Sequence, residues 1–212
     1  DALAAFDDCN VLTADCEWTA FPKEAKRRGI AWPWSRRRGK QAELYSLSLS
    51  GRVGDEVKSV GIALPLLDEE RETLVTLLRR VGLIFHNGMS DLIWLHRLRL
   101  PIKLVGDTMV LPHLLDERSP LGLEVLTGIY TPMLPGWKEE LWCERPRDVA
   151  TWRRLLERNT NDAYATLLLA EALYAELKTR PEDERRNVLR LYARHQLRAI
   201  PMLAKVALNG VP

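Results

Sequence analysis

An apolar segment near the N-terminus, residues 11–18, carries two carboxylates one residue apart, Asp15 and Glu17. The alternating pattern VLTADCEW predicts a buried β-strand on which Asp15 and Glu17 share one face, with Cα atoms roughly 7 Å apart. Two anions held this close on a core strand repel each other and are costly to desolvate. A raised pKa or a bound cation is the usual remedy. If the strand end instead reaches solvent, both carboxylates are simply hydrated. Whether other residues of the chain join these two acids decides between the two interpretations.

Composition predicts one main globular domain in a reducing compartment. The chain has 212 residues, 46% apolar and 28% charged, with a formal net charge of +2, which is typical of a single well-cored domain. Cys9, Cys16 and Cys143 are an odd number without metal-ligand spacing, so we expect reduced thiols and a cytoplasmic location. No apolar run approaches the roughly 18 residues of a membrane span, and the residues given contain no basic-then-apolar leader pattern. Because the sequence starts at Asp1 without a Met, we expect a fragment of a longer chain.

Residues 21–40 form a basic segment in which Lys23 to Lys40 includes eight Lys and Arg residues against one acid, Glu24, with Trp32 and Trp34 between them. One interpretation is an electrostatic hold on a phosphate backbone, with the tryptophans stacking on bases. The alternative is a solvated insertion without a ligand. The sequence favours neither.

Strand and helix patterns follow this segment. Residues 43–50 and 57–64 alternate in polarity around a turn at 51–54, which predicts an antiparallel hairpin. Short apolar runs at 83–85 and 104–107 predict buried parallel strands. Helices are expected after an N-cap at Asp68 and after one at Ser90, through Leu115, at 123–130, at 148–178 and at 184–209. The predicted fold is α/β, with three antiparallel strands followed by parallel strands and flanking helices.

Two further acids lie at the ends of core elements. Asp91 is expected in the first turn of the helix capped by Ser90, where the helix dipole would keep its carboxylate ionised. Asp162 lies in a polar stretch, residues 158–162, which alternatively forms an exposed turn with an Arg158–Asp162 ion pair. If Asp15, Glu17, Asp91 and Asp162 converge, they would bind two Mg²⁺ or Mn²⁺ ions, which prefer oxygen ligands and suit in-line displacement at phosphorus.

Three short motifs occur in a characteristic order: TADCE at 13–17, HNGMSD at 86–91 and NTNDA at 159–163. In this order they resemble the three exonuclease motifs of the DEDD superfamily of 3′ to 5′ exonucleases. The segments at 106–109, 123–130 and 136–138 are similar to linking segments of the proofreading domain of family A, polymerase I type, phage-like DNA polymerases. The tail at 189–211 is similar to the helix that leads into their polymerase domain. The resemblance covers nearly the whole chain.

This resemblance implies an RNase H-like fold with a mixed five-stranded sheet. It implies an exonuclease domain at 1–180 and, at 181–212, a helical tail like the start of a polymerase domain in the same full-length chain. Asp15, Glu17, Asp91 and Asp162 match the family's metal-binding carboxylates. They would support two-metal hydrolysis that releases nucleoside 5′-monophosphates from a single-stranded DNA 3′ end.

The resemblance also implies substrate contacts. Asn87 matches a residue near the terminal nucleotide, and His86 lies beside it, although a lone His at a strand end is more often structural. Trp18 and Thr19 follow the first motif, where the family contacts the last base and sugar. Trp18 alternates to the side opposite Glu17, so it fits the core equally well. Asp107 matches a position that supports the site or the structure around it.

One departure from the family pattern concerns the group that orients the attacking water. Family members have a Tyr four residues before the last Asp or a His five before it, and here these positions hold Arg158 and Glu157. A guanidinium stays protonated and cannot act as a general base. We therefore expect metal binding with weaker turnover. The alternatives are an RNA-trimming exonuclease of the ribonuclease D type, and a domain of little activity that binds or guides single-stranded DNA for an adjoining polymerase.

Overall fold

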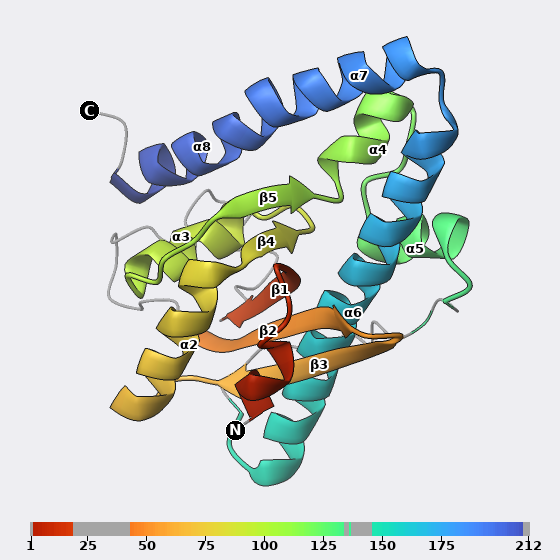
Figure 1. Cartoon of the computed structure of the whole chain (residues 1–212). Coiled ribbons are helices and arrows are strands. Elements are labelled where there is room, and N and C mark those ends of the chain that lie inside the picture. Colours follow the sequence, from red (N-terminus) through yellow and green to blue (C-terminus); the bar gives the residue numbers. More distant parts are fainter. Residues whose placement is uncertain (1, 19–42, 134–135, 137–145, 210–212) are drawn as a thin grey trace, which may run out of the picture.

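A five-stranded mixed sheet forms the centre of the molecule in the computed structural model, which describes residues 2–18, 43–133, 136 and 146–209 (Figure 1). The strand order is β3-β2-β1-β4-β5. β1 is antiparallel to β2, which is antiparallel to β3, while β4 is parallel to β1 and to β5. The predicted α/β fold with an RNase H-like sheet is confirmed. The strands are β1 (Val11–Trp18), β2 (Leu44–Val53), β3 (Glu56–Ala63), β4 (Gly82–Phe85) and β5 (Leu104–Asp107).

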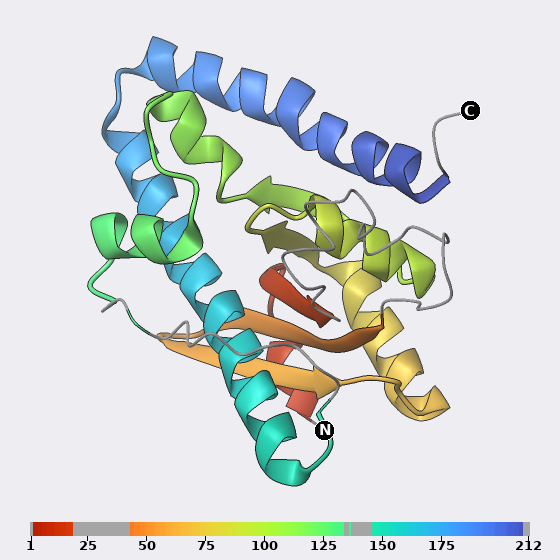
Figure 2. The same ribbon diagram turned by 180° about the vertical axis from the view of Figure 1, so that it is seen from behind.

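Helices cover both faces of the sheet. The long helix α6 (Val149–Thr179) crosses β1, β2 and β3 on one face, which Figure 2 shows in front. The helices α2 (Asp68–Arg80) and α3 (Met89–Arg97) pack into the apolar core on the other face. The remaining helices are η1 (Ala2–Phe6), α4 (Val110–Leu115), α5 (Leu123–Tyr130), α7 (Glu182–Leu191) and α8 (Leu197–Asn209).

Alternation along β1 separates core side chains from the acidic ones. Leu12, Ala14 and Cys16 are buried in the core formed with α2 and α3. Thr13 lies on the opposite face and its hydroxyl donates to the carbonyl oxygen of Ala163 in α6, at 2.7 Å. Because side chains two residues apart share a face, Asp15 follows Thr13 toward α6. The strand pattern thus places the carboxylates where the long helix passes.

The face of β2 beneath α6 is polar and tightly packed. Ser46, Ser48 and Ser50 are fully buried there. Small side chains allow the helix to approach the sheet closely. At Gly61 in β3, an added Cβ would lie 2.9 Å from the Thr160 hydroxyl oxygen. This close approach brings polar groups of α6 within hydrogen-bonding distance of β1 and β2.

Two predicted N-caps are wrong, and one alternative interpretation is excluded. The helix expected to start after Ser90 begins at Met89, after Gly88, and the backbone N–H groups of the preceding loop donate to the Asp107 carboxylate. Asp68 is the first residue of α2 rather than its N-cap. Residues 158–162 do not form an exposed turn, because α6 is continuous through them and buries Asp162.

The C-terminal tail packs against the rest of the molecule. Between α7 and α8 the helix is π-helical over Tyr192–Gln196. The Tyr192 hydroxyl donates to the Asp107 carbonyl oxygen at 3.0 Å. Ala204 in α8 is fully buried in the core that also contains α3. The division of the chain at residue 180 stays a prediction, and in this structure both parts share one core.

Several sequence-based interpretations fall on residues outside the described ranges. These are Thr19, the basic Lys23 to Lys40 segment, residues 137–138 of the segment at 136–138, and Cys143. Cys9 and Cys16 are buried free thiols, as expected. Among the helices described, none combines the length and the apolar character that crossing a bilayer requires.

His96 predicts a pH dependence of stability. Burial between α3 and α8, followed by the charge of Lys205, lowers its pKa. The unfolded chain therefore binds more protons as the pH falls through about 6.5, and the stabilisation present above that pH is lost. We expect the Tm of the wild type to decrease relative to that of the His96→Gln variant between pH 8 and pH 5.5, and this difference isolates His96 from other groups that titrate in the same range. An identical change of Tm in both proteins would contradict this assignment.

Candidate active site

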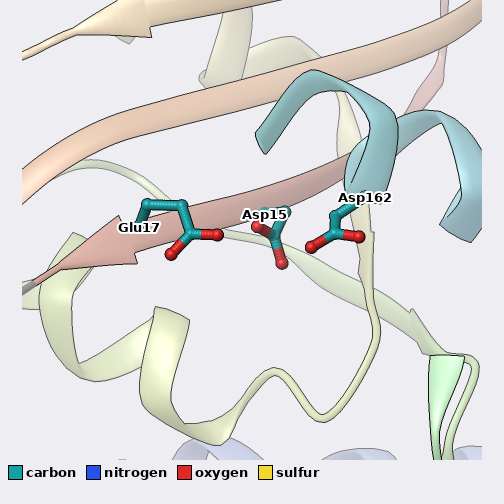
Figure 3. Close-up of side chains that lie close together, drawn as sticks. All are labelled: Asp15, Glu17 and Asp162. Atoms are coloured by element: carbon teal, nitrogen blue, oxygen red, sulfur yellow. The ribbon is translucent and has the colours of Figure 1, made fainter. Parts of the chain in front are cut away.

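Three carboxylates converge where β1 meets α6. Asp15 and Glu17 point from β1 toward Asp162 of α6 (Figure 3). One carboxylate oxygen from each lies within 4.8 Å of the other two. Asp162 is only 4% exposed, so water screens this negative charge poorly. Oxygen donors at this spacing fit a hard divalent cation such as Mg²⁺ or Mn²⁺. The structure therefore brings together three of the four expected ligands, Asp15, Glu17 and Asp162.

Asp91 lies beside this group rather than within it. Its Oδ1 accepts a hydrogen bond from the backbone N–H of Cys16 at 3.0 Å, and the residue is 5% exposed. Burial raises the pKa of Asp91 to about 7, although hydrogen bonds from backbone N–H groups act in the opposite direction. Desolvation thus opposes the helix dipole, which was expected to keep Asp91 ionised.

Arg158 is paired with Glu17. Its Nε lies 3.4 Å from the Glu17 Oε1, and the two side chains are 21% and 13% exposed. The ion pair that the sequence suggested was with Asp162. Because α6 continues past the site without a turn, the side chain of Arg158 reaches the strand instead. A fixed positive charge at a ligand oxygen offsets part of the repulsion in the cluster and competes with a metal ion for Glu17.

Asn159 also belongs to the site, and the sequence interpretation missed it. It is fully buried, and its Nδ2 donates to Asp15 Oδ2 at 2.6 Å. Its Oδ1 accepts from the hydroxyls of Ser46 and Ser48, each at 2.8 Å. Two signals were present in the sequence: Asn159 precedes Asp162 by three residues, which places both on one helix face, and serines occupy every second position of β2.

The loop between β4 and α3 carries two predicted substrate contacts. The His86 ring is held on both sides, with Nδ1 2.9 Å from the Thr108 hydroxyl and Nε2 2.9 Å from the Leu121 carbonyl oxygen. Asn87 has a positive φ of 60° and an exposed side chain. Asp107 accepts from the backbone N–H groups of Asn87, Gly88 and Met109. Asp107 thus fixes the loop, as its sequence position suggested.

Trp18 is the last residue of β1 and turns away from the carboxylates. It packs against the core, with its ring centroid 6.3 Å from that of Trp94 in α3. This is the core position that alternation along the strand predicted. The substrate contacts of Trp18, His86 and Asn87 stay predictions.

Comparison with known proteins places this geometry in a structural context. No protein-family model matches the sequence, and no curated protein matches it significantly.

Among solved structures, Brucella melitensis NrnC bound to pGG has a TM-score of 0.66 and 17% identity, covering 97% of this chain and 89% of its own. Escherichia coli RNase D, an exoribonuclease involved in structured RNA processing, has a TM-score of 0.61 and 18% identity, covering 99% of this chain and 48% of its own. The POL domain of Pol1 from M. smegmatis, in complex with DNA primer-template and dNTP, has a TM-score of 0.58 and 20% identity, covering 80% of this chain and 26% of its own.

The chain shares the fold of these solved structures, which include the exoribonuclease RNase D. This agrees with the superfamily that the three sequence motifs resemble. A further structure of NrnC carries bound Mg²⁺, and the acidic cluster of this chain is consistent with use of a divalent metal. At these identities the comparisons establish the fold, and the reaction has to be argued from the site.

Proposed function

We propose that this chain is a metal-dependent 3′ to 5′ exonuclease. The observation that carries the proposal is the convergence of Asp15, Glu17 and Asp162 at the junction of β1 and α6. A buried anionic cluster of this kind is costly unless a cation compensates it. The DEDD exonuclease fold and the three motifs in their order give that cation a hydrolytic role.

Different site residues are proposed to have different roles. Asp15, Glu17 and Asp162, with Asp91 beside them, would hold two Mg²⁺ or Mn²⁺ ions. Bound in this way, such ions activate water and stabilise the leaving 3′ oxygen at the terminal phosphodiester. Thr19, His86 and Asn87 would hold the last nucleotide, whereas Trp18 packs against Trp94 in the core. Arg158 stands where a water-orienting group is expected, so we propose that turnover is slow.

The finer proposal is a proofreading domain that acts on a single-stranded DNA 3′ end beside a polymerase domain of the same full-length chain, in the cytoplasm. It is supported by the resemblance of the tail and linking segments to family A polymerases. RNA trimming is the rival, and the likeness to RNase D keeps it open. A very short substrate is a further possibility, because NrnC was solved with pGG.

A different class of function is favoured by one observation, the ion pair between Arg158 and Glu17. If the Arg158 guanidinium stays paired with Glu17, it keeps a metal ion from that carboxylate. The domain would then bind or guide single-stranded DNA with little hydrolysis. Retention of all four carboxylates opposes this alternative.

Digestion of 5′-labelled substrates tests the proposal. Single-stranded DNA, single-stranded RNA and a dinucleotide are each incubated with Mg²⁺, Mn²⁺ or a chelator, beside the Asp15→Asn variant. We expect shortening from the 3′ end that requires both metal and Asp15. Preference for DNA supports proofreading, and preference for RNA or the dinucleotide contradicts it. Binding of DNA without cleavage under every condition would establish the guiding alternative.

A further inference from the structure

We infer that Asn159 is a positioning residue that fixes the Asp15 carboxylate for the metal ion. This role rests on the proposed function and adds a component that the motifs did not supply. The amide contacts Asp15 directly, with Nδ2 2.6 Å from Oδ2. An amide carries no net charge, so it orients the carboxylate without competing with a cation as a guanidinium does.

The orientation of the Asn159 amide is fixed by two serines. A side-chain carbonyl oxygen accepts two hydrogen bonds, and Oδ1 receives one from Ser46 and one from Ser48, both 2.8 Å long. The hydroxyls therefore hold the oxygen on the β2 side and direct the NH₂ group toward Asp15. A rotated amide would present its oxygen to an anion and leave both buried hydroxyls without this acceptor.

The register of the sheet makes this a compact unit. Ser48 is the cross-strand partner of Asp15, and Ser46 is the partner of Glu17. The serines thus lie across from the two acids, and Asn159 of α6 links them to Asp15 by accepting from both hydroxyls and donating to the carboxylate. Because Asn159 and the two serines are fully buried, we expect this geometry to be maintained before any metal binds. Groups that orient a ligand in this way typically change metal affinity by about 10- to 100-fold when they are removed.

The test measures Mn²⁺ affinity by electron paramagnetic resonance of the unbound ion, so no activity is needed. We expect Asn159→Ala to raise the Kd for Mn²⁺ about tenfold or more. The Ser46→Ala/Ser48→Ala double variant keeps the amide but removes its orientation, and it should show a smaller rise. Ser50→Ala is the matched control, since Ser50 lies on the same face of β2 but bonds to Ser59, and its Kd should equal that of the wild type.

Equal affinity in the wild type and in a folded Asn159→Ala protein would overturn the inference. So would a rise in Ser50→Ala as large as that in the serine pair. If Asn159→Ala does not fold, the serine pair decides alone, and an unchanged Kd there refutes the orienting role. A wild-type protein that binds no Mn²⁺ refutes the proposed function itself, which keeps the two failures distinct.

Discussion

Replacing Arg158 with Tyr should increase the exonuclease rate by about 10²-fold, the lower end of what a positioned acid or base contributes. The substitution removes the guanidinium that is paired with Glu17 and places a hydroxyl at the position where the exonuclease motifs that this sequence resembles carry the water-orienting Tyr. Two effects thus act in one direction, because the metal ion no longer competes for a Glu17 oxygen and the water gains a partner. The measurement is single-turnover cleavage of the preferred substrate at saturating Mn²⁺.

Two variants separate these effects. Arg158→Met removes the charge without adding a hydroxyl, so we expect tighter Mn²⁺ binding and a smaller gain in rate. Arg154→Tyr introduces the same side chain one turn earlier on an exposed part of α6 and should change neither quantity. If Arg158→Tyr cleaves no faster than the wild type, Arg158 does not occupy the water-orienting position.

Replacing Asp162 with Asn should abolish most of the activity while stabilising the protein in the absence of metal. Two charges that lie within 4.8 Å of each other repel by roughly 3 kcal/mol or more at an effective dielectric of 20, and the Arg158 charge offsets part of this. A net gain of about 1 kcal/mol corresponds to a rise in Tm of roughly 2 to 4 °C for a chain of this size. We expect cleavage to fall by at least 10²-fold, a magnitude usual for an essential group.

The same variant should lose its response to metal. An ion that binds only the folded state raises the Tm of the wild type, and this rise should be absent or strongly reduced in Asp162→Asn. The exposed Asp55→Asn, in the turn between β2 and β3, is the control and should behave like the wild type. A lower Tm for metal-free Asp162→Asn, or an unchanged response to Mn²⁺, would contradict the assignment of Asp162 to the cluster.

The sequence predicted the sheet well because its signals are local. Alternation around Asp15 and Glu17 defined the central strand, and the serine and leucine alternation of β2 defined its neighbour. The order of the motifs then predicted that Asp162 joins the first two acids. These features depend on the periodicity of side chains and on the order of motifs along the chain. Both are visible in a sequence without any knowledge of distances in the fold.

What the sequence did not predict depends on where elements meet. Whether Arg158 pairs along its helix with Asp162 or across to Glu17 depends on how α6 lies over β1, which no local pattern encodes. The role of Asn159 likewise depends on the depth at which α6 contacts the serines. The pKa of Asp91 required its burial, since the helix dipole alone indicated the opposite direction.

The position of Asp91 has a consequence for how site-directed variants are interpreted. Pairing between β1 and β4 ends at Thr13, so beyond that residue the first turn of α3 takes the place of the neighbouring strand by accepting the Cys16 N–H. Asp91 is therefore part of the scaffold as well as a predicted ligand. An alanine there would leave a buried backbone donor without this acceptor, at a cost of about 1–3 kcal/mol. An asparagine retains an acceptor and removes only the charge, so it is the substitution that isolates the electrostatic contribution.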